Sequence, residues 1–178
     1  MNKRTIAFFV GVCMIVSLSI GIYAQGEKAE YVGAAKCKMC HNSKKSGTQF
    51  TIWEGSAHAK AFATLASDES KAVAQKLGIA DPQKSENCLS CHTTGSGKVS
   101  VVASEGIGCE ACHGPGSAYK SMKIMKDITA GKEDGTKYGM LKADEAQCKT
   151  CHNEKSPTFK GFDYQTYWDK IKHPVPAN

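Results

Sequence analysis

Large apolar side chains are scarce in this sequence. Valine, isoleucine, leucine and phenylalanine together make up 20 of the 154 residues from Gln25 to Asn178, about 13%. A globular domain needs more than this for a core of its own, and such poverty is typical of disordered chains. The stretch is not low in complexity, however, and its net charge is only +4. Something other than aliphatic side chains must therefore fill the interior.

Acidic residues are absent from the first 24 positions. Two basic residues are followed there by an uncharged, mostly apolar run and then by the small residue Ala24. This order is typical of a secretory signal peptide. We predict a signal peptide over 1–24, with a retained N-terminal anchor as the alternative, and one domain over 25–178. The mature protein is expected in the periplasm, in contact with the membrane only if the leader is retained.

Eight of the nine cysteines form four pairs, and each pair has two intervening residues and is followed at once by histidine. We number these motifs 1 to 4 along the chain: Cys37-Lys38-Met39-Cys40-His41, Cys88-Leu89-Ser90-Cys91-His92, Cys109-Glu110-Ala111-Cys112-His113 and Cys148-Lys149-Thr150-Cys151-His152. This pattern is the attachment signal for c-type haem. The two thiols bond to one porphyrin, and the adjacent imidazole is the proximal ligand of its iron. The sequence therefore predicts four covalent haem c groups.

Other uses of cysteine explain the motifs less well. A disulfide framework gives the four histidines no role. A zinc site needs pairs brought together, and four identical units do not suggest this. A thioredoxin-like redox pair occurs once, in a βαβ setting.

Four haems also account for the missing core. The 154 residues leave about 38 for each haem, so neighbouring haems must pack close together and can exchange electrons. We predict a mostly α fold with few strands, organised around the haems. Helices are expected over 50–66, from Asp68 to Leu77 and from Ser117 to about Asp127, and the best strand material lies in 98–102.

Six histidines less four proximal ligands leave His58 and His173 as candidates for second axial ligands. Trp53 and Phe62 lie near His58 in the sequence, and an aromatic stretch precedes His173. The remaining two irons need methionine, another donor or nothing. Met122, Met125 and Met140 are candidates, with gap filling as the alternative role for each.

The order of motifs resembles the tetrahaem cytochrome c-554 family. The resemblance rests on motif 1, on Trp53 and the Ser-Ala-His-Ala-Lys-Ala segment 56–61, and on the Gly-Cys-Glu-Ala-Cys-His-Gly-Pro-Gly segment 108–116. It spans about Tyr31 to His173. The family carries electrons from hydroxylamine oxidoreductase in ammonia oxidisers, so the resemblance implies electron transfer.

The resemblance also implies a ligand set. His58 would bind the iron of the His152 haem, and His173 the iron of the His113 haem. The His92 haem would have an open face. In the family the first haem takes a histidine from the segment after the Gly-Pro-Gly turn, where this sequence has Lys123 instead. We therefore predict Met122 or Met125 as the second ligand of the His41 haem.

These observations favour a periplasmic electron-transfer protein. The expected partners are redox proteins, either a donor like hydroxylamine oxidoreductase or a membrane cytochrome that oxidises quinol, and no nucleic acid. An enzyme that reduces nitric oxide at the open haem is the alternative, but no spare histidine remains to donate protons there. A sensor or a subunit of a larger haem assembly is a third possibility.

Overall fold

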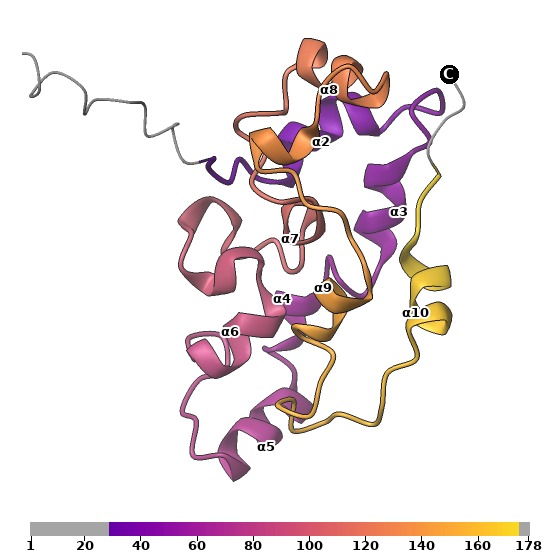
Figure 1. Ribbon diagram of the computed structural model, residues 1–178. Coiled ribbons are helices and arrows are strands. Elements are labelled where there is room, and N and C mark those ends of the chain that lie inside the picture. The colour runs from indigo at the N-terminus through magenta and orange to yellow at the C-terminus, as the bar shows by residue number, and fades with distance from the viewer. Residues whose placement is uncertain (1–28, 175–178) are drawn as a thin grey trace, which may run out of the picture.

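The computed structural model describes residues 29–174 and consists of short helices joined by long connections (Figure 1). The predicted signal peptide lies outside the described residues. The α-helices are α2 (Ala34–His41), α3 (Gln49–Gly55), α4 (Ala61–Thr64), α5 (Asp68–Lys76), α6 (Glu86–His92), α7 (Cys109–His113), α8 (Met122–Thr129), α9 (Glu145–Lys149) and α10 (Tyr164–Ile171). Three 3₁₀ helices are η1 (Thr94–Gly97), η2 (Ser100–Val102) and η3 (Gly135–Tyr138). No helix of the described part is long and apolar enough to cross a membrane.

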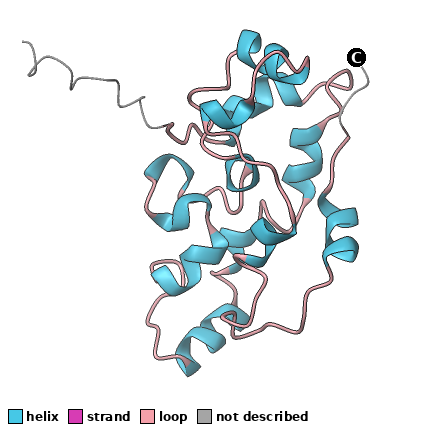
Figure 2. Cartoon of the chain, in the orientation of Figure 1, coloured by secondary structure: helices cyan, strands magenta, loops and turns pink. Residues whose placement is uncertain are grey.

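The predicted mostly α fold is confirmed, but the strand expected over 98–102 is wrong. Between residues 29 and 174 the chain contains helices and loops and no strand (Figure 2). Gly95 and Ser96 have φ of 68° and 57°, a left-handed conformation that interrupts extended backbone. The β-branched residues here have no partner strand, and Val102 packs into the interior instead, with 1% of its surface exposed.

The single helix expected over 50–66 is two helices. Its first part, α3, ends because Ser56 adopts an extended conformation with φ −80° and ψ 164°. The Ser56 hydroxyl then accepts the Ala59 N–H at 3.3 Å, which stabilises a turn in place of a continuous helix. His58 therefore lies in the connection between α3 and α4. Its carbonyl accepts the Ile107 N–H at 2.9 Å, so the connection is held to the segment before motif 3.

The helix predicted from Asp68 to Leu77 is confirmed as α5. Ser67 begins it by accepting the Ser70 N–H, and two acidic residues occupy its first turn, where the helix dipole favours negative charge. The helix predicted from Ser117 begins later, at Met122, with Ser121 as its cap. The preceding residues are held elsewhere, because the Ser117 N–H donates to the Glu30 carbonyl.

The buried apolar residues are few, as the composition predicts. They are Ala34, Phe50, Leu65, Ala74, Val102 and Tyr119. The buried polar residues are Thr93, Thr94 and Glu110. A core of this size cannot by itself offset the conformational entropy of about 150 ordered residues.

Gly106 allows the close approach between the His58 connection and the segment before motif 3. Its φ is +73°, and a Cβ added there would lie 2.5 Å from the His58 carbonyl oxygen. Gly131 has a similar φ of +69°, but a Cβ there would meet nothing within 4 Å. An alanine at Gly131 would therefore meet backbone strain alone, whereas an alanine at Gly106 would meet both backbone strain and a steric clash.

We expect Gly106→Ala to destabilise the protein more than Gly131→Ala does. Both substitutions place a side chain in the left-handed region, at about 1 kcal/mol, but only Gly106→Ala also displaces the His58 backbone. Guanidinium unfolding followed by far-ultraviolet circular dichroism would measure both. Equal losses would contradict the close approach.

Candidate functional site

Each of the four motifs lies on a helix or a helical turn. Motif 1 ends α2, motif 2 ends α6 and motif 3 forms α7. Motif 4 begins in α9 and continues as a turn, in which the His152 N–H donates to the Cys148 carbonyl at 3.0 Å. Residues three and four apart share one face of a helix, so each pair of thiols faces the same side as its histidine. This is the arrangement that one porphyrin requires.

The two remaining histidines lie opposite histidines of the motifs. The ring centres of His58 and His152 are 6.0 Å apart, and those of His113 and His173 are 5.9 Å apart. A metal ion held between two imidazoles needs about 2 Å for each metal–nitrogen bond and roughly 1 Å from each nitrogen to its ring centre. The resulting separation of about 6 Å matches both pairs. The residues present therefore fit a haem iron between each pair.

Burial keeps these imidazoles in the form that binds metal. It lowers the pKa of His58 and of His113, and in each pair the charge of the opposing histidine lowers it further. The pKa values of His152 and His173 are lowered chiefly by burial as well. Nδ1 of His173 is also buried with no hydrogen-bond partner. A neutral imidazole with a free lone pair is the ligand state for iron.

His92 is oriented differently. Its Nδ1 lies 2.8 Å from the Ala61 carbonyl oxygen, an acceptor, so Nδ1 carries the proton and Nε2 is left with the lone pair. A second hydrogen bond of this kind fixes the ring of a metal-binding histidine. Among the described residues no other histidine ring stacks on His92 or on His41, in contrast to the two pairs.

The candidate methionines differ in their surroundings. Met122, the first residue of α8, is 65% exposed, whereas Met125 is half-buried. Met140 packs near Gly135, where an added Cβ would lie 2.9 Å from its sulfur. The Met140 sulfur therefore lies close to the Gly135 backbone, and a methionine ligand of the His41 haem stays a prediction.

The aromatic residues near the ends of the site pack on histidine and on one another. Phe162 stacks on His152 with ring centres 4.7 Å apart, and Tyr167 contacts both rings. Trp53 packs on Phe50 with ring centres 5.1 Å apart and donates from Nε1 to the Ile107 carbonyl. The aromatic stretch before His173 thus covers the histidine of motif 4.

The motifs adjoin one another through their thiols. A hydrogen bond between Cys37 and Cys109 lowers the pKa of Cys37 and raises that of Cys109, so motif 1 adjoins motif 3. Burial and the nearby Cys148 raise the pKa of Cys112, so motif 3 adjoins motif 4. Burial raises the pKa of Cys151 to about 11, and the nearby Cys91 also raises it, so motif 4 adjoins motif 2. Two hydrogen bonds add to these contacts. Gln147 Nε2 donates to the Ala111 carbonyl at 2.9 Å, which joins α9 to motif 3. The Gly108 N–H donates to Thr94 Oγ1 at 2.8 Å, which joins the segment after motif 2 to the start of motif 3.

No disulfide joins the eight cysteines in the part of the chain from 29 to 174. No three histidine, cysteine or acidic side chains in that part are grouped to hold a metal ion, as a zinc site requires.

Comparisons with known proteins agree with this geometry. The sequence profile of the family described as "Cytochrome c554 and c-prime" matches residues 36–114, from motif 1 through motif 3. Cytochrome c-554 of Nitrosomonas europaea is 29% identical over 172 residues, which cover 84% of this chain and 71% of that protein. These two findings support the cytochrome c-554 family for this chain. The comparison with solved structures found no match.

The comparisons confirm the resemblance to the cytochrome c-554 family seen in the sequence. The protein is a haem-based electron-transfer cytochrome that binds haem c covalently. The haem iron supplies one-electron redox chemistry when it is bound. The chain's own residues attach the group, orient the imidazoles and hold the motifs together.

Two carboxylates that the sequence analysis missed hold motif 1 to motif 3. Glu110, between the cysteines of motif 3, is 3% exposed and accepts backbone N–H groups from Val32, Gly33 and Gly116 at 2.6 to 3.1 Å. Glu105 accepts the Ala34 N–H at 2.9 and 3.1 Å. The position of Glu110 inside a motif and before a Gly-Pro-Gly turn was the available signal.

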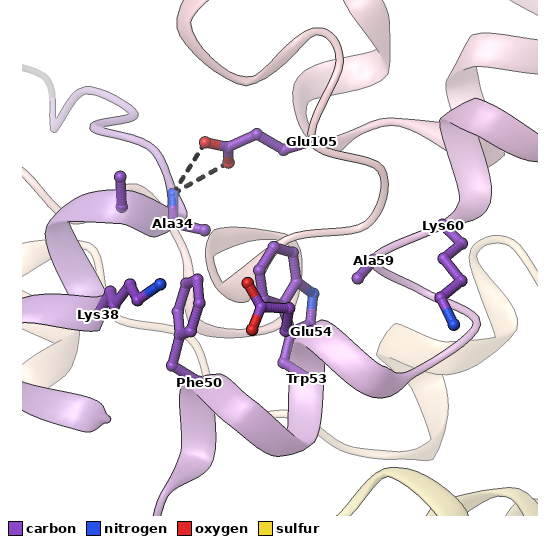
Figure 3. Close-up of a pocket in the computed structure, with 9 residues that line it drawn as sticks. Ala34, Lys38, Phe50, Trp53, Glu54, Ala59, Lys60 and Glu105 are labelled. Carbon is purple, nitrogen blue, oxygen red and sulfur yellow. Dashed lines mark hydrogen bonds between the residues drawn. The ribbon is translucent and has the colours of Figure 1, made fainter. Parts of the chain in front are cut away.

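Glu105 also borders a pocket beside α2 (Figure 3). The pocket has a volume of about 400 Å³, and its wall includes Phe50 and Trp53. The Glu105 carboxylate lies at the first turn of α2, where free N–H groups and the helix dipole favour negative charge. Gly33, the N-cap, provides no side-chain cap, so a residue distant in sequence does this.

We expect Glu110→Gln to destabilise the holoprotein by about 1–3 kcal/mol. The amide keeps one acceptor oxygen but places an NH₂ group against backbone N–H donors, which leaves buried donors unpaired. Guanidinium unfolding followed by far-ultraviolet circular dichroism measures the loss. The control is Glu154→Gln, because Glu154 is exposed and its side chain has no partner between residues 29 and 174. Equal losses of stability in the two variants would contradict the role of Glu110 in holding motif 1 to motif 3.

Proposed function

We propose that this protein is a periplasmic tetrahaem carrier that passes electrons between redox enzymes of a respiratory chain. The observation that carries the proposal is that every motif adjoins another: motif 1 adjoins motif 3, motif 3 adjoins motif 4, and motif 4 adjoins motif 2. No motif stands apart, so four haems attached there would be close neighbours. A protein of this kind can accept electrons one at a time, hold several and release them to a second partner.

Each residue of the site has a proposed role. Haem is attached through thioether bonds at Cys37 and Cys40, Cys88 and Cys91, Cys109 and Cys112, and Cys148 and Cys151. The proximal iron ligands are His41, His92, His113 and His152. His58 is the second ligand for the iron of His152, and His173 for that of His113. The separations of 6.0 and 5.9 Å between these rings support the two assignments.

The other two irons differ in their proposed ligands. For the His41 haem we propose Met125 or Met122, and the half-burial of Met125 favours it over the exposed Met122. The His92 haem would have no second ligand from the protein. The Ala61 carbonyl would hold the His92 ring in place.

The periplasmic location is supported by the leader pattern and by the resemblance to the cytochrome c-554 family. Covalent haem is expected to be attached after export, so a cytochrome with this leader would mature outside the cytoplasm. Its proposed partners are redox proteins, either a donor like hydroxylamine oxidoreductase or a membrane cytochrome that oxidises quinol. The structure of 29–174 is consistent with either.

The haem content and the spin states test the proposed function directly. We expect the mass of the purified, exported protein to exceed that of the mature polypeptide by four haems, and dithionite to reduce all four. Low-temperature electron paramagnetic resonance of the oxidised protein is expected to show three low-spin irons and one high-spin iron. Fewer than four haems would overturn the tetrahaem proposal, and two high-spin irons would contradict the methionine ligand.

We expect His58→Ala and His173→Ala each to convert one additional iron from low spin to high spin. The two residues serve different irons, so the double variant is expected to convert two. Electron paramagnetic resonance measures the change, and added imidazole should restore the low-spin signal because it replaces the missing ring. An unchanged spectrum in either single variant would contradict that ligand.

A further inference from the structure

Four lysines gather around motif 1 without acidic neighbours in sequence. Between Glu30 and Glu54 the chain contains four lysines and no acidic residue. Two lie in α2, and two lie in the turn after it. We call Lys36, Lys38, Lys44 and Lys45 the motif-1 lysines, and all four are exposed. This region therefore carries a strong local positive charge.

The motif-1 lysines are also free of ion pairs with residues 29–174. The ion pairs in that part of the chain use Lys71, Lys84, Lys98, Lys123, Lys149 and Lys172. Two acidic side chains near α2, Glu105 and Glu54, make contacts other than ion pairs with these lysines. Glu105 accepts from the α2 backbone, and Glu54 lines the pocket of Figure 3 together with Lys38 and Lys60. The charge of the motif-1 lysines is therefore left for a partner.

The haem attachment site of motif 1 is also exposed to solvent on this surface. Cys40 is exposed, whereas the other seven motif cysteines are half-buried. The adjacent Met39 is 79% exposed. A thioether bond at Cys40 would therefore lie at the surface, within five residues of each of the motif-1 lysines. Surface charge around an exposed redox group steers an oppositely charged partner and raises the association rate.

We propose that the motif-1 lysines and Met39 form the docking surface for an acidic redox-partner protein, and that electrons enter or leave through motif 1. The inference rests on the proposed function. In each encounter a reduced one-electron partner loses one electron, and one ferric haem iron of this protein gains it, with no proton moved. A protein partner is favoured over an anionic membrane because a lipid surface has no redox group to meet the exposed attachment.

A plant-type [2Fe–2S] ferredoxin is a suitable probe, because it is a small acidic protein that donates one electron at low potential. The test variant is Lys36→Glu/Lys44→Glu/Lys45→Glu, which spares Lys38 between the motif cysteines. The matched control is Lys76→Glu/Lys155→Glu/Lys160→Glu. These lysines are exposed, and none forms an ion pair with residues 29–174. Both variants change the net charge equally, so only the position differs.

Two measurements use the holoprotein. Calorimetric titration with oxidised ferredoxin gives the affinity without electron transfer, and stopped-flow mixing with reduced ferredoxin gives the rate. For wild type we expect both to fall about tenfold or more between about 0.01 and 0.15 M salt. At low salt we expect the test variant to lose about tenfold in affinity and rate, and the control less than about threefold.

Equal losses in the two variants would overturn the docking surface, because net charge alone would then explain the effect. It would also be overturned if the protein bound vesicles containing phosphatidylserine through the motif-1 lysines and did not bind ferredoxin. Reduction by dithionite separates this inference from the proposed function. Variants that dithionite reduces like wild type leave the carrier intact, whereas a wild type that dithionite cannot reduce would overturn the carrier itself.

Discussion

Covalent attachment of a flat, apolar group is the constraint on which this structure depends. The described chain buries only a few apolar side chains, and its α-helices are four to nine residues long, too short to be stable alone in water. A helix of that length persists only where something packs on it. The motifs satisfy this need, since each puts two cysteines and a histidine on one helical face. The polypeptide thus consists of short helices that would pack around the covalently bound haem.

Wrapping a chain around such groups leaves backbone donors without helix or sheet partners, and buried carboxylates meet this need. Glu110 accepts from three different backbone N–H groups, and Glu105 accepts at the start of α2. Both join the segment before motif 1 to the region of motif 3. Unpaired buried N–H groups are costly, so one carboxylate with two acceptor oxygens is an efficient solution in a protein with no sheet among its described residues. The same contacts keep motifs 1 and 3 adjacent.

The chemistry of the site could be read from the sequence, because the motif is local: two residues separate the thiols, and histidine follows. The positions of His58 and His173 opposite motif histidines agree with the sequence count, since few histidines remain once the motifs are counted. The predictions that failed depend on distant contacts. The helix over 50–66 breaks at Ser56, where the connection is held by Ile107. The strand over 98–102 has no partner strand. The burial of Glu110 depends on its hydrogen bonds with the backbone of Val32 and Gly116, and the contact with Val32 is distant in sequence.

The contacts between motifs also distinguish motif 1 from motif 2. Motif 1 adjoins motif 3, whereas motif 2 adjoins motif 4 and the segment that leads into motif 3. Motifs 1 and 2 differ in character. At motif 1 an exposed cysteine lies among unpaired lysines, and at motif 2 the His92 ring is fixed by the Ala61 carbonyl. A carrier must exchange electrons with partners without mixing them, and two chemically different motifs joined through motifs 3 and 4 provide a physical basis for that separation. His113 of motif 3 and His152 of motif 4 each face a second imidazole, so under the proposed ligand set their irons would have an imidazole on both sides.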